Sequence, residues 1–254
     1  NISIRNQGKL KKMKQKKVSL YKKSKWFILF AKKTLSIIEN SILLFSPLKG
    51  SYFQKTNWPL LTLLEQNSSL IINEWTSLKK IHTKNIQDIT IYDAALTTDD
   101  KWQVESLMIM SKDSRLSHKR FETTYNLLKS IPGMQNIFFS VLDPGKKIAP
   151  HRGIYRGLIR THLGIITAKN NEDCWIEING VRKSWEASKA FAFDDGLTHN
   201  VENNTDEPRI ILIIDVERPF YKGIAILNKF VIWVLSESSY IKNIRKNWTT
   251  LSTQ

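Results

Sequence analysis

The second half of this 254-residue chain alternates short apolar runs with turn signals, and this pattern constrains the fold more than any other feature. The runs are rich in β-branched and aromatic residues, which is typical of strands in a β-sandwich or barrel. Five strands are predicted, over the ranges 135–142, 158–166, 174–178, 181–185 and 209–216, and a sixth is expected at 190–193.

Asn179-Gly180 separates two of these strands and is a strong hairpin signal, because a type I′ turn needs a positive φ at both central residues. Strands at this spacing favour a mainly β fold with flanking helices, arranged as a jelly roll with the N-terminal helices packed outside. The single cysteine, Cys174, is expected to pack within a strand and excludes an internal disulfide.

Helical signals precede the strands. A helix is predicted from Asn57, with Asn57 as the N-cap and Pro59 in the first turn, because apolar residues follow at helical spacing up to Trp75. A second helix is predicted over 117–130, where Pro132 and a glycine end it.

The formal net charge of +16 suggests a nucleic acid or an anionic membrane as partner, but it is unevenly distributed. Twelve Lys and Arg residues precede the first acidic residue, Glu39, and the rest of the chain holds 27 basic against 23 acidic residues. The leader is therefore interpreted as a solvated tail, with a specific basic arm as the alternative. Nucleic acid is not the expected partner of the nearly balanced remainder.

Residues 26–48 are strongly apolar, but charged residues leave no run of 18 or more uncharged positions in them. A spanning helix is therefore not expected. Two interpretations stay open: an interfacial helix beside the basic leader at an anionic membrane surface, or a helix packed on its own domain.

Strand parity indicates candidate functional residues. Arg160 and His162 share one face of the strand predicted at 158–166, because side chains two residues apart point the same way. Ser140 is the polar side chain in the run IFFSVL, and Arg209 begins the final strand. Each also has an ordinary structural explanation: Arg160 and His162 could lie on a solvent-exposed face, Ser140 in a bulge and Arg209 in a turn.

The histidines favour chemistry, because His151, His162 and His199 lie within or beside predicted strands. Neutral imidazoles at strand ends of a small barrel commonly hold a transition metal. Two histidines would leave coordination positions open for a substrate, a cosubstrate and oxygen.

The segments SVLDPGKKIAPHRGIYRGLIRTHLGII, CWIEINGVRKSWE and FAFDDGLTHNVENNTDEPRIILIIDVERPF, between Ser140 and Phe220, resemble the aspartyl/asparaginyl β-hydroxylase family. That resemblance implies a double-stranded β-helix, the cupin-like form of the jelly roll, and an Fe(II)/2-oxoglutarate-dependent dioxygenase. It covers about a third of the chain closely.

Carried over residue by residue, the resemblance makes His151 and His199 the iron ligands. Many oxygenases of this fold add a carboxylate two residues after the first histidine, where this chain has Gly153. The aspartyl hydroxylase branch tolerates glycine there, whereas the similar lipid A hydroxylase branch typically has aspartate. Gly153 thus favours the protein or peptide branch and marks an open ligand position on the metal. In some related halogenases such an open position admits a halide. The motif around Gly153, however, is that of the hydroxylases.

The resemblance also implies a site for 2-oxoglutarate. Arg209 matches the arginine that pairs with its distal carboxylate, and Ser140 matches the hydroxyl that shares that carboxylate. His162 is expected near the metal-side carboxylate. Arg160 is expected near either that carboxylate or an acidic group of the substrate. Asp195 and the preceding aspartate are left out of the ligand set and interpreted as groups that order the loop or surround the site.

The function implied is hydroxylation of an Asp or Asn side chain in a peptide, protein or tethered amino acid, using Fe(II), 2-oxoglutarate and O2. The alternatives are a lipid A acyl-chain hydroxylase and a non-catalytic binding module. We expect a cytoplasmic protein, peripheral to the inner face of a membrane through its leader. The expected domains are a leader (1–55), a catalytic domain (56–222, barrel core 135–220) and a helical extension (223–254).

Overall fold

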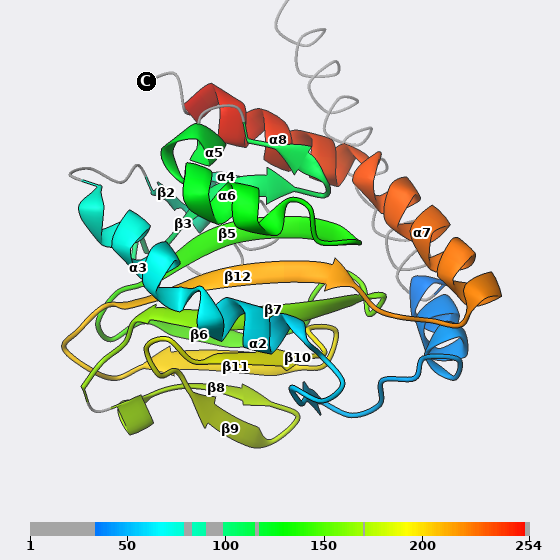
Figure 1. Ribbon diagram of the computed structural model, residues 1–254, viewed down its shortest axis with the longest axis horizontal. Coiled ribbons are helices and arrows are strands. Elements are labelled where there is room, and N and C mark those ends of the chain that lie inside the picture. The colour runs from blue at the N-terminus through cyan, green and yellow to red at the C-terminus, as the bar shows by residue number, and fades with distance from the viewer. Residues whose placement is uncertain (1–33, 79–82, 90–98, 115–116, 170, 252–254) are drawn as a thin grey trace, which may run out of the picture. The chain divides into compact units, whose positions relative to one another are not determined.

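The computed structural model describes residues 34–78, 83–89, 99–114, 117–169 and 171–251 (Figure 1). The chain divides into two units, residues 1–44 and residues 45–254. In the first unit, residues 34–43 form a helix within the apolar segment predicted at 26–48. The basic leader before residue 34 lies outside the described residues, so its partners stay a prediction.

The second unit contains a larger sheet of eight strands in the order β1-β10-β7-β12-β5-β3-β2, with β4 paired to β3 (Figure 1). All of its strand pairs are antiparallel. The strands are β1 (Tyr52–Phe53), β2 (Lys84–Asn85), β3 (Trp102–Ile109), β4 (Lys112–Asp113), β5 (Met134–Leu142), β7 (Leu158–Ile166), β10 (Ala190–Phe193) and β12 (Arg209–Glu217).

A smaller sheet has the order β6-β11-β8-β9 and is also antiparallel. Its strands are β6 (Lys147–His151), β8 (Cys174–Ile178), β9 (Val181–Ser184) and β11 (His199–Asn203). From β5 to β12 the chain passes repeatedly between the two sheets, with the β8–β9 hairpin in the middle. This winding is the double-stranded β-helix, so the expected fold class is confirmed.

Two apolar cores lie on opposite faces of the larger sheet. The inner core joins the sheets and includes Ile176 from β8, Ile211 from β12 and Phe193 from β10. The outer core packs the larger sheet against α2 (Leu60–Gln66), α3 (Ser68–Ser77) and α6 (Glu122–Leu128). Strand β12 is buried along both faces because it lies between these cores. The N-terminal helices therefore pack outside the barrel, as predicted.

An aromatic group joins helices to strands in the outer core. Phe121 is fully buried, and its ring centroid lies 4.7 Å from that of Phe139 on β5 and 5.7 Å from that of Trp75 on α3. Trp58, before α2, donates a hydrogen bond from Nε1 to Thr161 Oγ1 on β7 at 2.9 Å.

Helices α7 (Lys222–Ser236) and α8 (Ser239–Leu251) follow the barrel. Helix α8 packs with α4 (Ile86–Ile89) and β3 around buried Trp248. In the described residues no single helix is long and apolar enough to cross a membrane; α7 and α8 pass that test jointly, by length and composition, with a 56° bend between them.

The strands predicted at 158–166, 174–178 and 190–193 are confirmed with the same bounds. The other predicted strands differ by one residue at one end. The hairpin is confirmed too, since Asn179 has φ 51° and Gly180 has φ 80°. Cys174 is a buried strand residue, as expected.

Both helix predictions need correction. Asn57 is not the N-cap, because α2 begins at Leu60 after Pro59, and Asn57 Oδ1 instead accepts a hydrogen bond from the Gln54 backbone N–H at 2.9 Å. The helix predicted at 117–130 is two helices, α5 (Ser117–Arg120) and α6. They separate at Phe121, whose backbone is not helical and whose ring enters the outer core.

Strands β3, β6 and β11 were not predicted from the sequence. Strand β6 contains Pro150 and is mostly exposed, so it lacks an apolar run. Strand β11 reads HNVEN, and two of its three buried residues, His199 and Asn203, are polar, which conceals the strand pattern. Strand β3 buries Glu105 and Ser106 among its apolar residues.

We expect Phe121→Ala to lower the free energy of unfolding by about 3–5 kcal/mol, because it leaves a cavity between Trp75 and Phe139. Urea unfolding followed by circular dichroism measures the change. Leu70→Ala is the matched control, since Leu70 on α3 is 51% exposed and should lose well under ~1 kcal/mol. Equal losses in the two variants would contradict this account of the outer core.

Candidate active site

Strands of both sheets direct polar side chains into the space between the sheets. Arg160 and His162 on β7 lie on the inner face, opposite the face that packs on α2 and α3, which confirms the predicted strand parity. Arg209 and Asp215 lie at the two ends of the inner face of β12. Ser140 is on β5, beside β12 in the same sheet.

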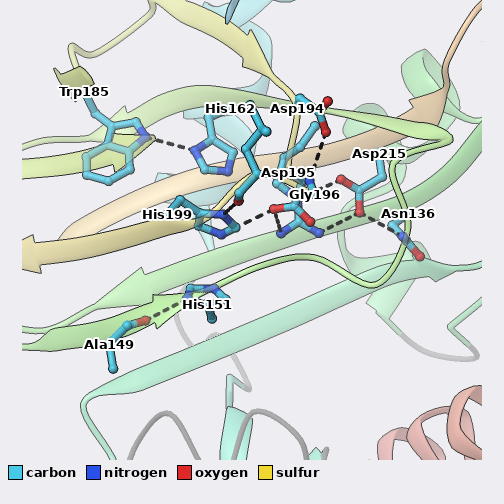
Figure 2. Close-up of polar contacts among 12 residues, drawn as sticks. Asn136, Ala149, His151, His162, Trp185, Asp194, Asp195, Gly196, His199 and Asp215 are labelled. Carbon is cyan, nitrogen blue, oxygen red and sulfur yellow. Dashed lines mark hydrogen bonds and ion pairs between the residues drawn. The ribbon is translucent and has the colours of Figure 1, made fainter. Parts of the chain in front are cut away.

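His151 and His199 come from neighbouring strands of the smaller sheet. They are cross-strand partners at the end of β6 and the start of β11, and their ring centroids are 4.2 Å apart. Nδ1 of each ring lies 2.9 Å from a backbone carbonyl two residues earlier. The partner of His199 is the Leu197 carbonyl, and that of His151 is the Ala149 carbonyl, which Figure 2 shows. A carbonyl accepts the Nδ1 proton, so Nε2 of each ring keeps a lone pair that a metal could use.

Burial and the neighbouring His199 lower the pKa of His151 to about 4. The imidazole of His151 is therefore neutral near pH 7, which is the protonation state that binds a metal. In the described part of the chain, no group of three or more His, Cys, Asp or Glu residues is arranged to hold a metal ion.

Asp195 occupies the space beside Gly153. Its Oδ1 lies 3.5 Å from His199 Nε2, and its backbone carbonyl accepts a hydrogen bond from Gly153 N–H at 2.8 Å. A Cβ added to Gly153 would lie 1.8 Å from Asp195 Oδ2. A side chain at position 153 would therefore have to displace the Asp195 carboxylate, which reaches this space from a different loop.

Arg160 holds Asp195 in place. Its Nη1 donates to Asp195 Oδ1 at 2.8 Å, and its Nε and Nη2 donate to the two oxygens of Asp215 at 2.8 and 2.9 Å. Asn136 adds a hydrogen bond from Nδ2 to Asp215 Oδ2 at 2.9 Å. The Arg160 guanidinium therefore binds carboxylates of the protein itself.

Asp194 has a separate structural role, since it is fully buried and pairs with Arg156 and Arg218. Its Oδ1 also accepts a hydrogen bond from Gly196 N–H at 3.1 Å (Figure 2). These contacts fix the loop that carries Asp195.

Arg209 is a buried cation that lacks a carboxylate partner among the described residues. Its side chain is 3% exposed, its guanidinium lies 4.6 Å from the Trp185 ring, and Nη2 donates to Ser140 Oγ at 3.1 Å. Burial lowers its pKa to about 10, so it stays charged at neutral pH, and its Nε has no hydrogen-bond partner within the described chain. Such a group requires an anion to offset its desolvation.

Ser140 and His162 offer further polar atoms to the same space. Ser140 Oγ also accepts a hydrogen bond from Trp102 Nε1 at 3.2 Å, which leaves its hydroxyl proton for another acceptor. His162 Nδ1 accepts from Trp185 Nε1 at 3.2 Å, so its Nε2 carries the proton, and that buried Nε2 has no partner in the described chain. Burial, with Arg160 and Arg209 nearby, keeps the pKa of His162 well below its usual value.

A cavity of about 220 Å³ opens beside His151. His151, Gly153, Arg160 and Asp195 line one part of it. Most of the remaining wall is apolar and comes from β3, α4, α7 and α8: it includes Ile86, Ile89, Val104, Met108, Ile109, Leu235, Ile241, Ile244 and Trp248.

Three of the seven residues selected from the sequence, His151, Gly153 and Arg160, line this cavity. The other four lie outside its lining: His199 lies beside His151, and Ser140, His162 and Arg209 are linked to one another directly or through Trp185. Sequence reasoning did not select Trp102 and Trp185, which position Ser140 and His162. Their signal was weak, because tryptophan in an apolar strand also fits ordinary core packing. The pairing of Asp195 with Gly153 has no sequence signal, since 42 positions separate them.

A family model described as aspartyl/asparaginyl beta-hydroxylase matches residues 65–219. The match covers more than half of the chain, and the chain belongs to this family. The resemblance found in the sequence is thereby confirmed.

Two relatives carry different names. The chain is 32% identical over 158 residues to an ornithine lipid ester-linked acyl 2-hydroxylase of Rhizobium tropici, covering 62% of this chain and 55% of that protein. It is 30% identical over 132 residues to the human aspartyl/asparaginyl beta-hydroxylase, covering 50% of this chain and 17% of that protein. A solved cupin 2 conserved barrel domain protein from Salinispora arenicola CNS-205 aligns at 14% identity and a TM-score of 0.32, covering 61% of this chain and 99% of that one.

We expect Gly153→Ala to lower the free energy of unfolding by about 1–3 kcal/mol, because the added methyl group collides with the Asp195 carboxylate. In an Asp195→Ala background the same change should cost less than about 0.5 kcal/mol, since the colliding atoms are gone. Chemical denaturation of the four proteins of this double-mutant cycle, all without metal, measures the coupling. Additive losses would show that Asp195 does not fill the space beside Gly153.

Proposed function

We propose that this protein is an Fe(II)/2-oxoglutarate-dependent dioxygenase that hydroxylates an aliphatic carbon, consumes O2 and releases succinate and CO2. One observation carries the proposal: two histidines whose Nδ1 atoms face backbone carbonyls, His151 and His199, lie in the same barrel interior as Arg209, a buried arginine with no carboxylate partner among the described residues. Iron suits the first feature and a dicarboxylate suits the second. Membership of a hydroxylase family supports the same chemistry.

The donor set fits both groups. His151 and His199 would hold the metal, and the cavity lined by His151 would leave room for exchangeable ligands. Arg209 and Ser140 would bind the distal carboxylate of 2-oxoglutarate through the guanidinium and the free hydroxyl proton. His162 would donate from its unpartnered Nε2 to the other end of the cosubstrate. When bound, iron and 2-oxoglutarate supply the oxidising chemistry that inserts one atom of O2 into a C–H bond.

The remaining residues position these groups. Asp195 presents a carboxylate 3.5 Å from His199 Nε2, where it can accept hydrogen bonds from water or another ligand beside the histidine pair. Arg160 orients that carboxylate through a hydrogen bond from Nη1. From the sequence, Arg160 could bind either the cosubstrate or the substrate. Its ion pairs with Asp195 and Asp215 support a positioning role instead.

Two substrate classes follow from the relatives. An Asp or Asn side chain in a peptide, protein or tethered amino acid is the first candidate, because the human relative is named for that reaction. An acyl chain of a lipid is the second candidate, and the apolar lining of the cavity favours it. The bacterial relative is named as an acyl 2-hydroxylase.

We expect Arg209→Ala to weaken 2-oxoglutarate binding by about 10- to 100-fold with little effect on iron, because it removes a charged hydrogen-bond donor from one carboxylate. His199→Ala should instead abolish iron-dependent succinate release. Calorimetric titration with 2-oxoglutarate and measurement of retained iron separate the two effects.

Arg182→Ala is the matched control for Arg209→Ala, since Arg182 is an exposed β9 arginine paired with Glu177. Equal losses of iron in the Arg209 and His199 variants would contradict the assigned roles. A wild-type protein that releases no more succinate than His151→Ala would indicate a non-catalytic binding module.

The substrate class is tested by incubating the iron-loaded protein with acidic peptides, lipid A and ornithine lipid, followed by mass spectrometry. Hydroxylation adds about 16 Da, the mass of one oxygen atom. From the cavity lining we expect a gain on a lipid acyl chain that Ile244→Asp reduces, because a carboxylate there would oppose apolar burial. A gain on Asp or Asn peptides alone would support the first candidate and exclude the lipid.

A further inference from the structure

Helix α7 exposes an apolar stripe along its outer side. Ile226 is 72% exposed, Trp233 59% and Phe230 57%, although all three are large apolar residues. The stripe consists of Ile226, Leu227, Phe230, Trp233 and Val234, which recur at helical spacing, and exposed Tyr221 directly precedes the helix. Exposed apolar groups of this size, arranged on one side of a helix, usually mark an interaction surface.

The stripe is not needed to hold α7 on the domain, because the opposite side does that. Asn228, Val231 and Ile232 are buried. Tyr155 donates a hydrogen bond from its hydroxyl to Asn228 Oδ1 at 2.8 Å, and Asn228 Nδ2 donates to the Gly157 carbonyl at 3.2 Å. The helix is therefore fixed by its inner side and presents the stripe from a rigid support.

Charge identifies the occupant of this surface. Lys222 and Lys229 are exposed, lie seven residues apart and therefore share one flank of the stripe, and α7 contains no acidic residue. From Lys222 onward the sequence holds five basic residues and one acidic residue. Apolar and aromatic side chains flanked by lysines are typical of helices that lie in the headgroup region of anionic membranes.

We propose that the outer side of α7 docks on the surface of an anionic lipid bilayer. The stripe enters the boundary between headgroups and acyl chains, and the two flanking lysines contact lipid phosphates. This contact is separate from the one expected for the basic leader, because it uses different residues.

The helix pair lies along the domain instead of crossing the bilayer. Arg245 on α8 donates to the carbonyls of Ile109 and Met110 at 3.2 and 3.0 Å. Asn247 donates to the Ile89 carbonyl at 3.0 Å. These bonds fix α8 to β3 and α4, so α8 could not continue into the membrane without breaking them.

Docking also relates to the cavity. Leu235 of α7 lines the cavity, as do Tyr240 and Ile241 of α8. A bilayer held against α7 would bring acyl chains next to the helix pair that walls the cavity. This step depends on the proposed function, whereas docking itself does not.

Co-sedimentation with vesicles tests the docking. We expect the full-length protein to bind vesicles of 70% phosphatidylcholine and 30% phosphatidylglycerol, and Phe230→Asp/Trp233→Asp to bind at least ~10-fold more weakly. Lys222→Glu/Lys229→Glu should lose binding in a salt-dependent manner. Leu70→Asp is the matched control, because it adds a charge at a 51% exposed leucine on α3 and should bind as wild type does.

Binding by both α7 variants that equals wild type would overturn the proposal and assign any membrane contact to other residues. A wild-type dimer that Phe230→Asp/Trp233→Asp converts to monomers, with unchanged vesicle binding, would overturn it in favour of a second copy. All binding is measured without iron or 2-oxoglutarate. Failure of docking is thus distinguishable from failure of the proposed chemistry, which succinate release reports.

Discussion

The guanidinium of Arg160 between two carboxylates is the interaction on which the site depends. It ties β7 to β12 through Asp215 and ties both strands to the loop of Asp195. Removing one member of such a partly buried set typically costs about 3–5 kcal/mol, because the remaining charges lose their compensation. The set therefore stabilises the barrel and also fixes the carboxylate that lies beside the histidine pair.

Most of the barrel follows from the sequence, because strands buried on both faces carry unmistakable apolar runs. Strand β12 and the inner-face placement of Arg160 and His162 are of this kind. Strand β11 is different: Asn203 is fully buried there, and its side-chain Nδ2 donates hydrogen bonds to the carbonyls of Leu142, Asp143 and Glu207. Hydrophobic patterns do not reveal a strand in which two of the three inward residues, His199 and Asn203, are polar.

In the candidate site, too, the sequence reveals some features and not others. The resemblance to a family indicates which residues to examine, but it does not show what each contacts. In the sequence, Gly153 is simply the absence of a ligand carboxylate, whereas the structure shows that the Asp195 carboxylate fills the space beside it from another loop. Arg209 and Arg160 read as similar strand arginines, yet Arg160 pairs with two carboxylates and Arg209 pairs with none among the described residues. Only the folded arrangement separates a positioning group from a group that requires a ligand.

The two-residue strand β1 has a consequence for the integrity of the whole sheet. It pairs with β10, and the neighbouring Ser51 carbonyl accepts a hydrogen bond from Asp194 N–H at 3.0 Å. Without this strand, β10 would present unpaired backbone groups, and open edges of this kind recruit strands from other molecules. The short segment ahead of the barrel thus keeps the sheet from joining another sheet edge to edge, next to the loop that carries the site's carboxylate.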